Sequence, residues 1–259
     1  MLSLKTRRLV HLFAPDGKCL VVAMDHAGFM DKPQRGLERP EDFIRGVVHA
    51  GADAFLLALG SAQQCAEGIG RAGVWLSVDA QPPLLERIVE MALRIGADGI
   101  KCMVYPWCQD APNSMANFAA LAADCCKWGM PVMAEVIPGG FNASAEARSP
   151  ERIAAGARVA MEAGADVIKT FYTGDAESFH TVTRNCAVPI IVLGGEPTTN
   201  DRELLQNVRG ALDAGATGVA IGRNIWGHAQ PDQITRALAA VIHSKSSVDE
   251  ALAVCRRET

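Results

Sequence analysis

The sequence has few aromatic residues, no basic run and no long apolar run. Phe, Trp and Tyr make up 5% of the 259 residues, so a large core must be packed with small aliphatic side chains, as in parallel sheets buried on both faces. The formal net charge is −4, and without a basic patch a nucleic-acid partner is not expected. Neither a membrane span nor the apolar core of a signal peptide is present in the sequence. We therefore expect a cytoplasmic protein without a membrane segment.

Metal-binding and redox motifs are also missing. The eight cysteines form no C-x-x-C pair, and the six histidines form no H-x-H or H-E-x-x-H motif. We expect the cysteines to be reduced and to pack as small apolar side chains. No metal site is expected from the sequence.

A short phrase occurs four times along the chain. An amphipathic stretch ends in Gly-Ala and a short apolar run follows, with the glycines at Gly51, Gly96, Gly164 and Gly215. Four further apolar runs lie between these repeats, at Cys19–Asp25, Val74–Asp79, Pro131–Ile137 and Val188–Gly194. Eight strands alternating with helical segments predict parallel pairing through right-handed crossovers. We expect an α/β protein whose residues 1–259 form a single (β/α)₈ TIM barrel, a usual size for this fold.

Polar residues follow the expected strands at the end where TIM barrels carry their active sites. Carboxylates, a lysine and glycine pairs should therefore meet on one rim. Read in chain order, these positions are Asp25, His26, Asp79, Tyr105, Glu135, Lys169, Gly194, Gly195, Gly222 and Arg223.

Two lysines occupy matching positions in the repeats. Lys101 and Lys169 follow their glycines at the same offset, where the other two repeats carry Leu56 and Ala220. Because barrel side chains pack in layers from alternate strands, both lysines should point inward at one height. A neighbouring ammonium and desolvation lower a lysine pKa and release the free amine needed to attack a carbonyl. This predicts one nucleophile and one activator, without selecting between them; alternatively, each lysine only forms a buried ion pair with Asp25, Asp79 or Glu135.

Four motifs carry a resemblance to a known family. They are VVAMDH (Val21–His26), GADVIKTFY (Gly164–Tyr172), VPIIVLGGEP (Val188–Pro197) and GATGVAIGRNIW (Gly215–Trp226). Together they resemble the archaeal-type class I fructose-bisphosphate aldolases and their relatives, the autoinducer-phosphate thiolases and the heptulosonate synthases. The last two motifs are most similar to the thiolase branch.

The resemblance implies specific roles. Lys169 is implied to be the Schiff-base lysine, with catalytic roles for Asp25 and, in thiolase-like relatives, for His26. Glu135 and Ile137 stand where archaeal aldolases carry a Trp and a proton-transferring Tyr, so Glu135 is expected to transfer protons. The resemblance also implies a homo-oligomer, a ring of five or stacked rings.

The expected chemistry is a retro-aldol cleavage, with an imine on Lys169 as the electron sink. Carboxylates within hydrogen-bonding reach would move the protons. The candidates are Asp25 and Glu135, followed by Tyr105 and His26, although each can instead only orient a lysine. Gly194 and Gly195 after strand 7, and Gly222 and Arg223 after strand 8, are expected to bind a phosphate. The alternative is that these glycines serve only the fold.

The predicted function is therefore a metal-independent class I aldolase, a lyase acting on a small phosphorylated sugar or keto compound. No cofactor is expected beyond the covalent imine. Three alternatives remain: a thiolase that uses coenzyme A as co-substrate, a phosphosugar isomerase or epimerase with Glu135 as base, and a non-catalytic phosphosugar sensor. Specificity is expected in the loops 61–73, 105–115 and 138–148, the last being an expected mobile active-site loop.

Overall fold

Eight parallel strands form a closed barrel in the computed structural model, which describes residues 4–79, 85, 87–198 and 200–255. Each strand pairs with its neighbours in chain order, and β1 pairs with β8 to close the sheet. The predicted TIM barrel is confirmed, and each strand lies within or next to its predicted run. The strands are β1 (Cys19–Ala23), β2 (Ala54–Leu57), β3 (Gly73–Val78), β4 (Gly99–Val104), β5 (Val132–Val136), β6 (Val167–Thr170), β7 (Ile190–Leu193) and β8 (Gly218–Ile221).

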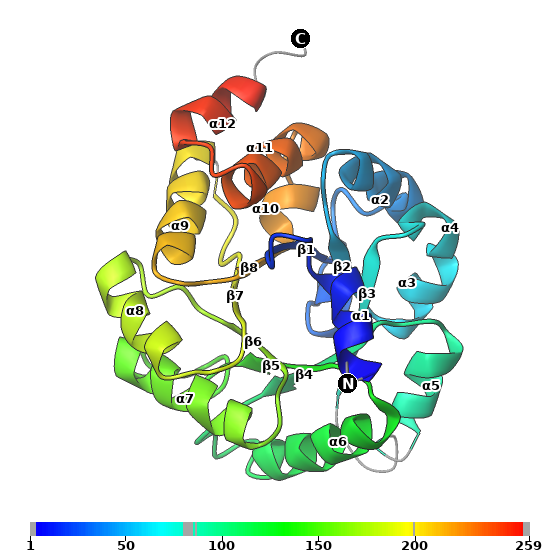
Figure 1. Ribbon diagram of the computed structural model, residues 1–259, viewed down its shortest axis with the longest axis vertical. Helices are drawn as coiled ribbons and strands as arrows, with labels where there is room; N and C mark the ends of the chain where they lie inside the picture. Colours follow the sequence, from blue (N-terminus) through cyan, green and yellow to red (C-terminus); the bar gives the residue numbers. More distant parts are fainter. Residues whose placement is uncertain (1–3, 80–84, 86, 199, 256–259) are drawn as a thin grey trace.

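Helices surround the barrel (Figure 1). Several begin at capping residues: the Ser149 hydroxyl accepts the backbone N–H of Arg152 at the start of α7, and the Asn200 side chain accepts that of Glu203 in α9. None of the helices in the described part of the chain is long and apolar enough to cross a membrane. Their bounds are α1 (Leu4–Leu12), α2 (Pro40–His49), α3 (Leu59–Gln64), α4 (Ala66–Ile69), α5 (Ile88–Arg94), α6 (Ser114–Trp128), α7 (Pro150–Glu162), α8 (Ala176–Arg184), α9 (Asp201–Asp213), α10 (Arg223–Trp226), α11 (Pro231–His243) and α12 (Val248–Cys255).

The barrel interior holds the residues that the repeat predicted to point inward. Leu56 and Ala220 are buried in one apolar cluster with Trp75, and Leu12 of α1 packs into the same cluster from the N-terminal end. A second apolar cluster fills the space between the sheet and the surrounding helices. All eight cysteines lie in the described residues, and none forms a disulfide. The interior is therefore a packed core that leaves its polar chemistry to the C-terminal ends of the strands.

The repeated phrase also explains how the strands are held at their N-terminal ends. All four repeat glycines have positive φ, which suits the left-handed turn between helix and strand. The aspartate that follows in three repeats accepts a backbone N–H from a neighbouring strand. These contacts are Asp53 to Leu20 at 2.6 Å, Asp98 to Val74 at 3.0 Å and Asp166 to Val132 at 2.9 Å. In the fourth repeat, the Thr217 hydroxyl donates to Ile190 O at 3.1 Å instead. The repeat is thus a structural motif as well as a marker of strands.

His243, the last residue of α11, connects this helix to the same end of the barrel. Its Nε2 lies 3.0 Å from Asp53 Oδ2 and its Nδ1 lies 3.0 Å from Asp16 Oδ2. The hydrogen bond to Asp53 raises the pKa of His243, and with Asp16 it outweighs the effect of burial, which lowers it. Because the folded pKa exceeds the unfolded value of about 6.5, this stabilisation is fully present below that pH. It is lost as the pH rises through the folded pKa.

His243→Gln is therefore expected to destabilise the protein most in mild acid. We expect a loss of about 1–2 kcal/mol in the free energy of unfolding at pH 6, and a clearly smaller loss at pH 9. Urea unfolding at the two pH values measures the difference, with the exposed His49→Gln as the control. An equal loss at both pH values would show that packing, not charge, is responsible.

Candidate active site

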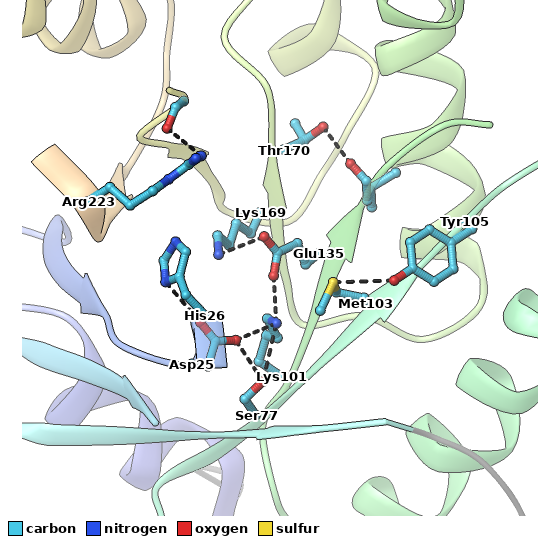
Figure 2. Close-up of polar contacts among 12 residues, drawn as sticks. Asp25, His26, Ser77, Lys101, Met103, Tyr105, Glu135, Lys169, Thr170 and Arg223 are labelled. Carbon is cyan, nitrogen blue, oxygen red and sulfur yellow. Dashed lines mark hydrogen bonds and ion pairs between the residues drawn. The ribbon is translucent and has the colours of Figure 1, made fainter. Parts of the chain in front are cut away.

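Four charged side chains occupy the C-terminal layer of the barrel interior. The relative exposures of Asp25, Lys101, Glu135 and Lys169 are 5%, 0%, 8% and 4%. Lys101 Nζ lies 2.7 Å from Asp25 Oδ2 and 2.6 Å from Glu135 Oε2, and Lys169 Nζ lies 2.7 Å from Glu135 Oε1 (Figure 2). Glu135, on the strand between the two lysines, therefore bridges them. The two lysines share a layer as predicted, and both form the buried ion pairs of the alternative interpretation.

The charges of this layer hold one another in their ionised forms. Burial alone would lower the pKa of Lys101, but the Glu135 and Asp25 carboxylates outweigh it and raise this pKa. Burial would likewise raise the pKa of Asp25 and Glu135, but Lys101, and then Lys169, lower both. The decrease expected when two lysines meet is thus absent for Lys101, because two carboxylates flank it. The two carboxylates therefore favour the cationic form of Lys101.

Ser77 on β3 belongs to the same network and was not predicted from the sequence. Its hydroxyl donates to Asp25 Oδ2 at 2.7 Å and accepts from Lys101 Nζ at 3.2 Å. The sequence indicates Asp79, at the end of this strand, as a possible ion-pair partner of the lysines. In the structure, Ser77 is the β3 residue that contacts the charged layer. The sequence indicates Ser77 only weakly. It is a small polar residue in an otherwise apolar strand, and strand alternation points it to the same inward side as Trp75.

A cavity of about 450 Å³ opens over this layer. Lys169 and Glu135 line it, together with His26 and the predicted phosphate residues Gly194, Gly195, Gly222 and Arg223. Lys101 is fully buried. The cavity therefore distinguishes two lysines that their spacing left equivalent, because Lys169 meets the space in which a substrate can bind.

A larger groove of about 830 Å³ lies at the other end of the barrel, beside α1. Its acidic side chains, Asp53 and Asp98, already accept backbone N–H groups and pair with His243 and His11. The paired lysines are absent from its lining. The smaller cavity is therefore the candidate active site, since it combines a lysine, carboxylates and anion-binding groups.

His26 lines the cavity, whereas Tyr105 lies apart from it. Burial, reinforced by Lys169 and Arg223, lowers the pKa of His26 to about 4 despite Asp25, so the imidazole is neutral at pH 7. The Tyr105 hydroxyl donates to Met103 Sδ at 3.3 Å (Figure 2). Tyr105 lines a separate cavity of about 70 Å³ with Asp79, and burial raises its pKa to about 12. Of the predicted catalytic residues, the structure groups five and leaves Tyr105 outside.

The predicted phosphate residues meet where β7 and β8 end. Arg223 is the first residue of α10; its Nη1 lies 2.7 Å from Glu196 Oε2, and its Nη2 donates to Gly195 O at 3.0 Å. Among the described residues, its buried Nε has no hydrogen-bond partner. Asn224, which was not predicted, joins the two loops by donating to Gly194 O at 2.9 Å. A Cβ at Gly222 would lie 2.5 Å from Ala23 O, so this glycine also serves packing.

The loops expected to set specificity contribute unequally. Phe141 and Arg148 of the 138–148 loop line the cavity, so this loop lies beside the candidate site. Arg148 fixes the loop internally, donating to Pro138 O and Gly140 O at 2.7 Å each. Much of 61–73 forms α3 and α4 instead of an irregular loop, and neither this segment nor 105–115 lines the cavity.

Comparisons with known proteins identify the family of the chain. The family model of the DeoC/LacD family aldolases matches residues 19–228. The chain is 36% identical to a 2-amino-3,7-dideoxy-D-threo-hept-6-ulosonate synthase of Halobacterium salinarum, covering 96% of this chain and 95% of that protein. It is 30% identical to a class 1 fructose-bisphosphate aldolase of Thermoproteus tenax, covering 96% of this chain and 98% of that protein.

A solved structure extends the similarity to the fold. An archaeal fructose-1,6-bisphosphate aldolase, described with its catalytic Lys covalently bound to the carbinolamine intermediate of its substrate, superimposes with a TM-score of 0.78. It is 29% identical, and 92% of this chain and 99% of that chain are covered. The prediction of a class I aldolase, a lyase, is confirmed, and the thiolase and isomerase alternatives are not favoured. The chain belongs to the DeoC/LacD family of aldolases.

Proposed function

We propose that Lys169 forms a Schiff base with a small phosphorylated carbonyl compound and that a C–C bond next to the imine is then cleaved or formed. The observation that carries the proposal is that Lys169, of the two bridged lysines, lines the cavity together with Arg223. A lysine bound covalently to the substrate in the related archaeal aldolase supports the same chemistry.

Glu135 and Lys101 prepare Lys169 for this reaction. To attack, Lys169 must give up a proton, and Glu135 Oε1 accepts at 2.7 Å from Nζ. The amine lone pair then bonds to the carbonyl carbon, and loss of water from the carbinolamine leaves a cationic iminium. Because an iminium replaces an ammonium, the charge balance with the carboxylates is restored. Lys101 favours the ionised forms of Asp25 and Glu135 before this proton transfer, and Glu135 returns its proton to the hydroxyl group that leaves as water.

Cleavage follows from the same arrangement. The substrate hydroxyl gives its proton to a carboxylate, an aldehyde leaves, and the C–C electron pair moves into the iminium to form an enamine. Protonation of the enamine carbon and hydrolysis by water release the ketone and regenerate Lys169. Glu135 is the proposed acid–base residue next to the imine nitrogen, with Asp25 and neutral His26 at the other side of the layer.

The phosphate is proposed to bind between the loops that follow β7 and β8. Gly195, Gly222 and the start of α10 offer backbone N–H groups, and Arg223 offers its guanidinium. The named relatives make or cleave small sugars and keto compounds, which is the substrate class proposed here. No cofactor is required by this chemistry. Assembly into a ring of identical subunits is a further proposal from the resemblance, and a cytoplasmic location is a separate proposal.

Borohydride reduction tests the imine directly. The protein is incubated with dihydroxyacetone phosphate or fructose 1,6-bisphosphate, reduced, and analysed by peptide mass spectrometry. The expected result is a stable adduct on the peptide that contains Lys169. An adduct confined to Lys101 would reassign the nucleophile, and no adduct with either compound would contradict the proposal.

Glu135→Gln is expected to lower kcat by about 10²- to 10⁴-fold, because the amide retains the shape but cannot take a proton. Lys101 retains its ion pair with Asp25, so the fold should persist. Single-turnover kinetics measure the effect, with the exposed Glu151→Gln as the matched control. A change confined to KM would instead assign Glu135 to substrate binding.

Glu196→Gln is expected to lower the KM of a phosphorylated substrate by about 2- to 5-fold. Glu196 pairs with Arg223 and its side chain is 84% exposed, so its removal frees a donor at small cost. Arg223→Leu should raise the same KM. If Glu196→Gln also raises KM, this carboxylate orients Arg223 for binding instead of competing with the phosphate.

A further inference from the structure

An aromatic bridge crosses the mouth of the active site. Phe29 follows β1 and Phe141 follows β5, and these strands lie on opposite sides of the closed barrel. The two rings nevertheless stack, with centroids 5.9 Å apart and planes inclined by 24°. Loops from opposite walls therefore meet through this pair. We call Phe29 and Phe141 the aromatic bridge.

Contacts on both sides support the aromatic bridge. The ring of Phe29 lies 5.4 Å from that of His26, and the ring of Phe141 meets Tyr105 edge-on at 5.9 Å. Behind Phe141, the hydrogen bonds of Arg148 to two carbonyls fix the 138–148 loop. The bridge is thus held in place before any substrate binds. Tyr105, which does not line the cavity, thus has a structural role in supporting Phe141.

The bridge remains largely uncovered. Phe29 and Phe141 are 46% and 55% exposed, although large apolar side chains in contact with each other usually become buried. Both line the active-site cavity, as do Ile137 and Phe171. Exposed aromatic rings at the mouth of a cavity with a few placed polar groups are typical of a ligand subsite.

The cavity therefore contains two chemically different sets of groups. Gly194, Gly195, Gly222 and Arg223 suit an anion, whereas the bridge, Ile137 and Phe171 suit an apolar body. Arg148 lies in the second set, but two of its nitrogens donate to the loop and its guanidinium lies 4.3 Å from the centre of the Phe171 ring. Its contacts hold the loop in position, which leaves the phosphate to the first set.

We propose that the aromatic bridge binds the acceptor aldehyde and selects one with an apolar, unphosphorylated chain. The inference rests on the proposed function, since it assumes an enamine of the donor on Lys169. The enamine carbon adds to the aldehyde carbon, and the C=O electron pair moves to the aldehyde oxygen, which takes a proton. The iminium re-formed on Lys169 is then hydrolysed by water. The bridge contacts the acceptor chain during this step and does not contact the donor phosphate.

Acceptor kinetics test this assignment. Dihydroxyacetone phosphate serves as donor, and pentanal is compared with glyceraldehyde 3-phosphate as acceptor. The native protein is expected to have the higher kcat/KM with pentanal. Phe141→Ala and Phe29→Ala should lower kcat/KM for pentanal by about 3- to 10-fold, whereas borohydride trapping of the donor alone should not change. Phe141→Tyr should retain the native value, and Trp128→Ala, which removes an aromatic ring 51% exposed on α6, is the control.

Three results would overturn the assignment. A preference for glyceraldehyde 3-phosphate that disappears in Arg148→Met would show that this end of the cavity binds an anion. If pentanal kinetics are unchanged in both alanine variants while donor trapping is normal, the acceptor assignment of the aromatic bridge fails and the proposed function stands. If the native protein traps no donor, the proposed function fails and the bridge assignment fails with it.

Discussion

Lys169→Met is expected to abolish borohydride trapping and to lower kcat by at least about 10⁴-fold. A covalent nucleophile splits one difficult step into two easier ones. When the nucleophile is lost, neither of these easier steps can occur, and the rate falls. Methionine has a similar length and is apolar, so it retains the packing of β6 but offers no lone pair for the carbonyl. Steady-state kinetics and mass spectrometry of the reduced protein measure the two effects.

Lys169→Arg tests whether activity requires the nucleophilic amine or only a positive charge at this position. Arginine preserves a cation beside Glu135 but cannot form the imine, so it should be as inactive as the methionine variant. Lys127→Met, at an exposed lysine with 74% of its side chain accessible, is the control for the substitution itself. Activity within about 10-fold of native in Lys169→Met would instead point to chemistry without a covalent intermediate, such as an isomerase using Glu135.

The barrel was predictable because its signals are periodic. The repeat marks β2, β4, β6 and β8, and strand alternation fixes which side chains point inward. Lys101, Lys169, Leu56 and Ala220 therefore fell in the barrel interior as expected. Strand ends also placed Glu135 and Asp25 at the site, since all parallel strands end on one rim.

Side-chain direction beyond the strand ends was not predictable in the same way. Tyr105 follows β4 at the correct rim, yet its hydroxyl turns to Met103, because no strand periodicity fixes a side chain in a loop. Glu196 and Arg223 form an ion pair only because the fold brings together two loops that are distant in sequence. Phe29 and Phe141 lie more than a hundred residues apart, and only barrel closure brings them together. Contacts of this kind depend on tertiary geometry.

Lys101→Met is expected to lower the free energy of unfolding at pH 7 by about 3–5 kcal/mol, because it leaves two buried carboxylates without their shared cation. In the native protein, Lys101 depresses the pKa of Asp25 and Glu135, so its stabilisation is present above their unfolded pKa values of about 4. It is lost as the pH falls through the folded values. The deficit of the variant should therefore persist from pH 7 to about pH 4 and shrink below that pH, which urea unfolding between pH 7 and pH 2 measures. A deficit independent of pH would assign the loss to packing alone.

The second variant Lys101→Met/Asp25→Asn decides whether the deficit comes from unbalanced charge. Removing one carboxylate with its cation leaves Glu135 paired with Lys169, so the layer is neutral again. The double variant should be more stable than Lys101→Met alone, although it has lost another native group, and the coupling between the two substitutions should be at least about 1 kcal/mol. Asp79→Asn, at an exposed carboxylate that does not reach the layer, should be additive with Lys101→Met. Recovery of stability in the double variant would then show that unbalanced charge, and not lost packing, causes the deficit of Lys101→Met.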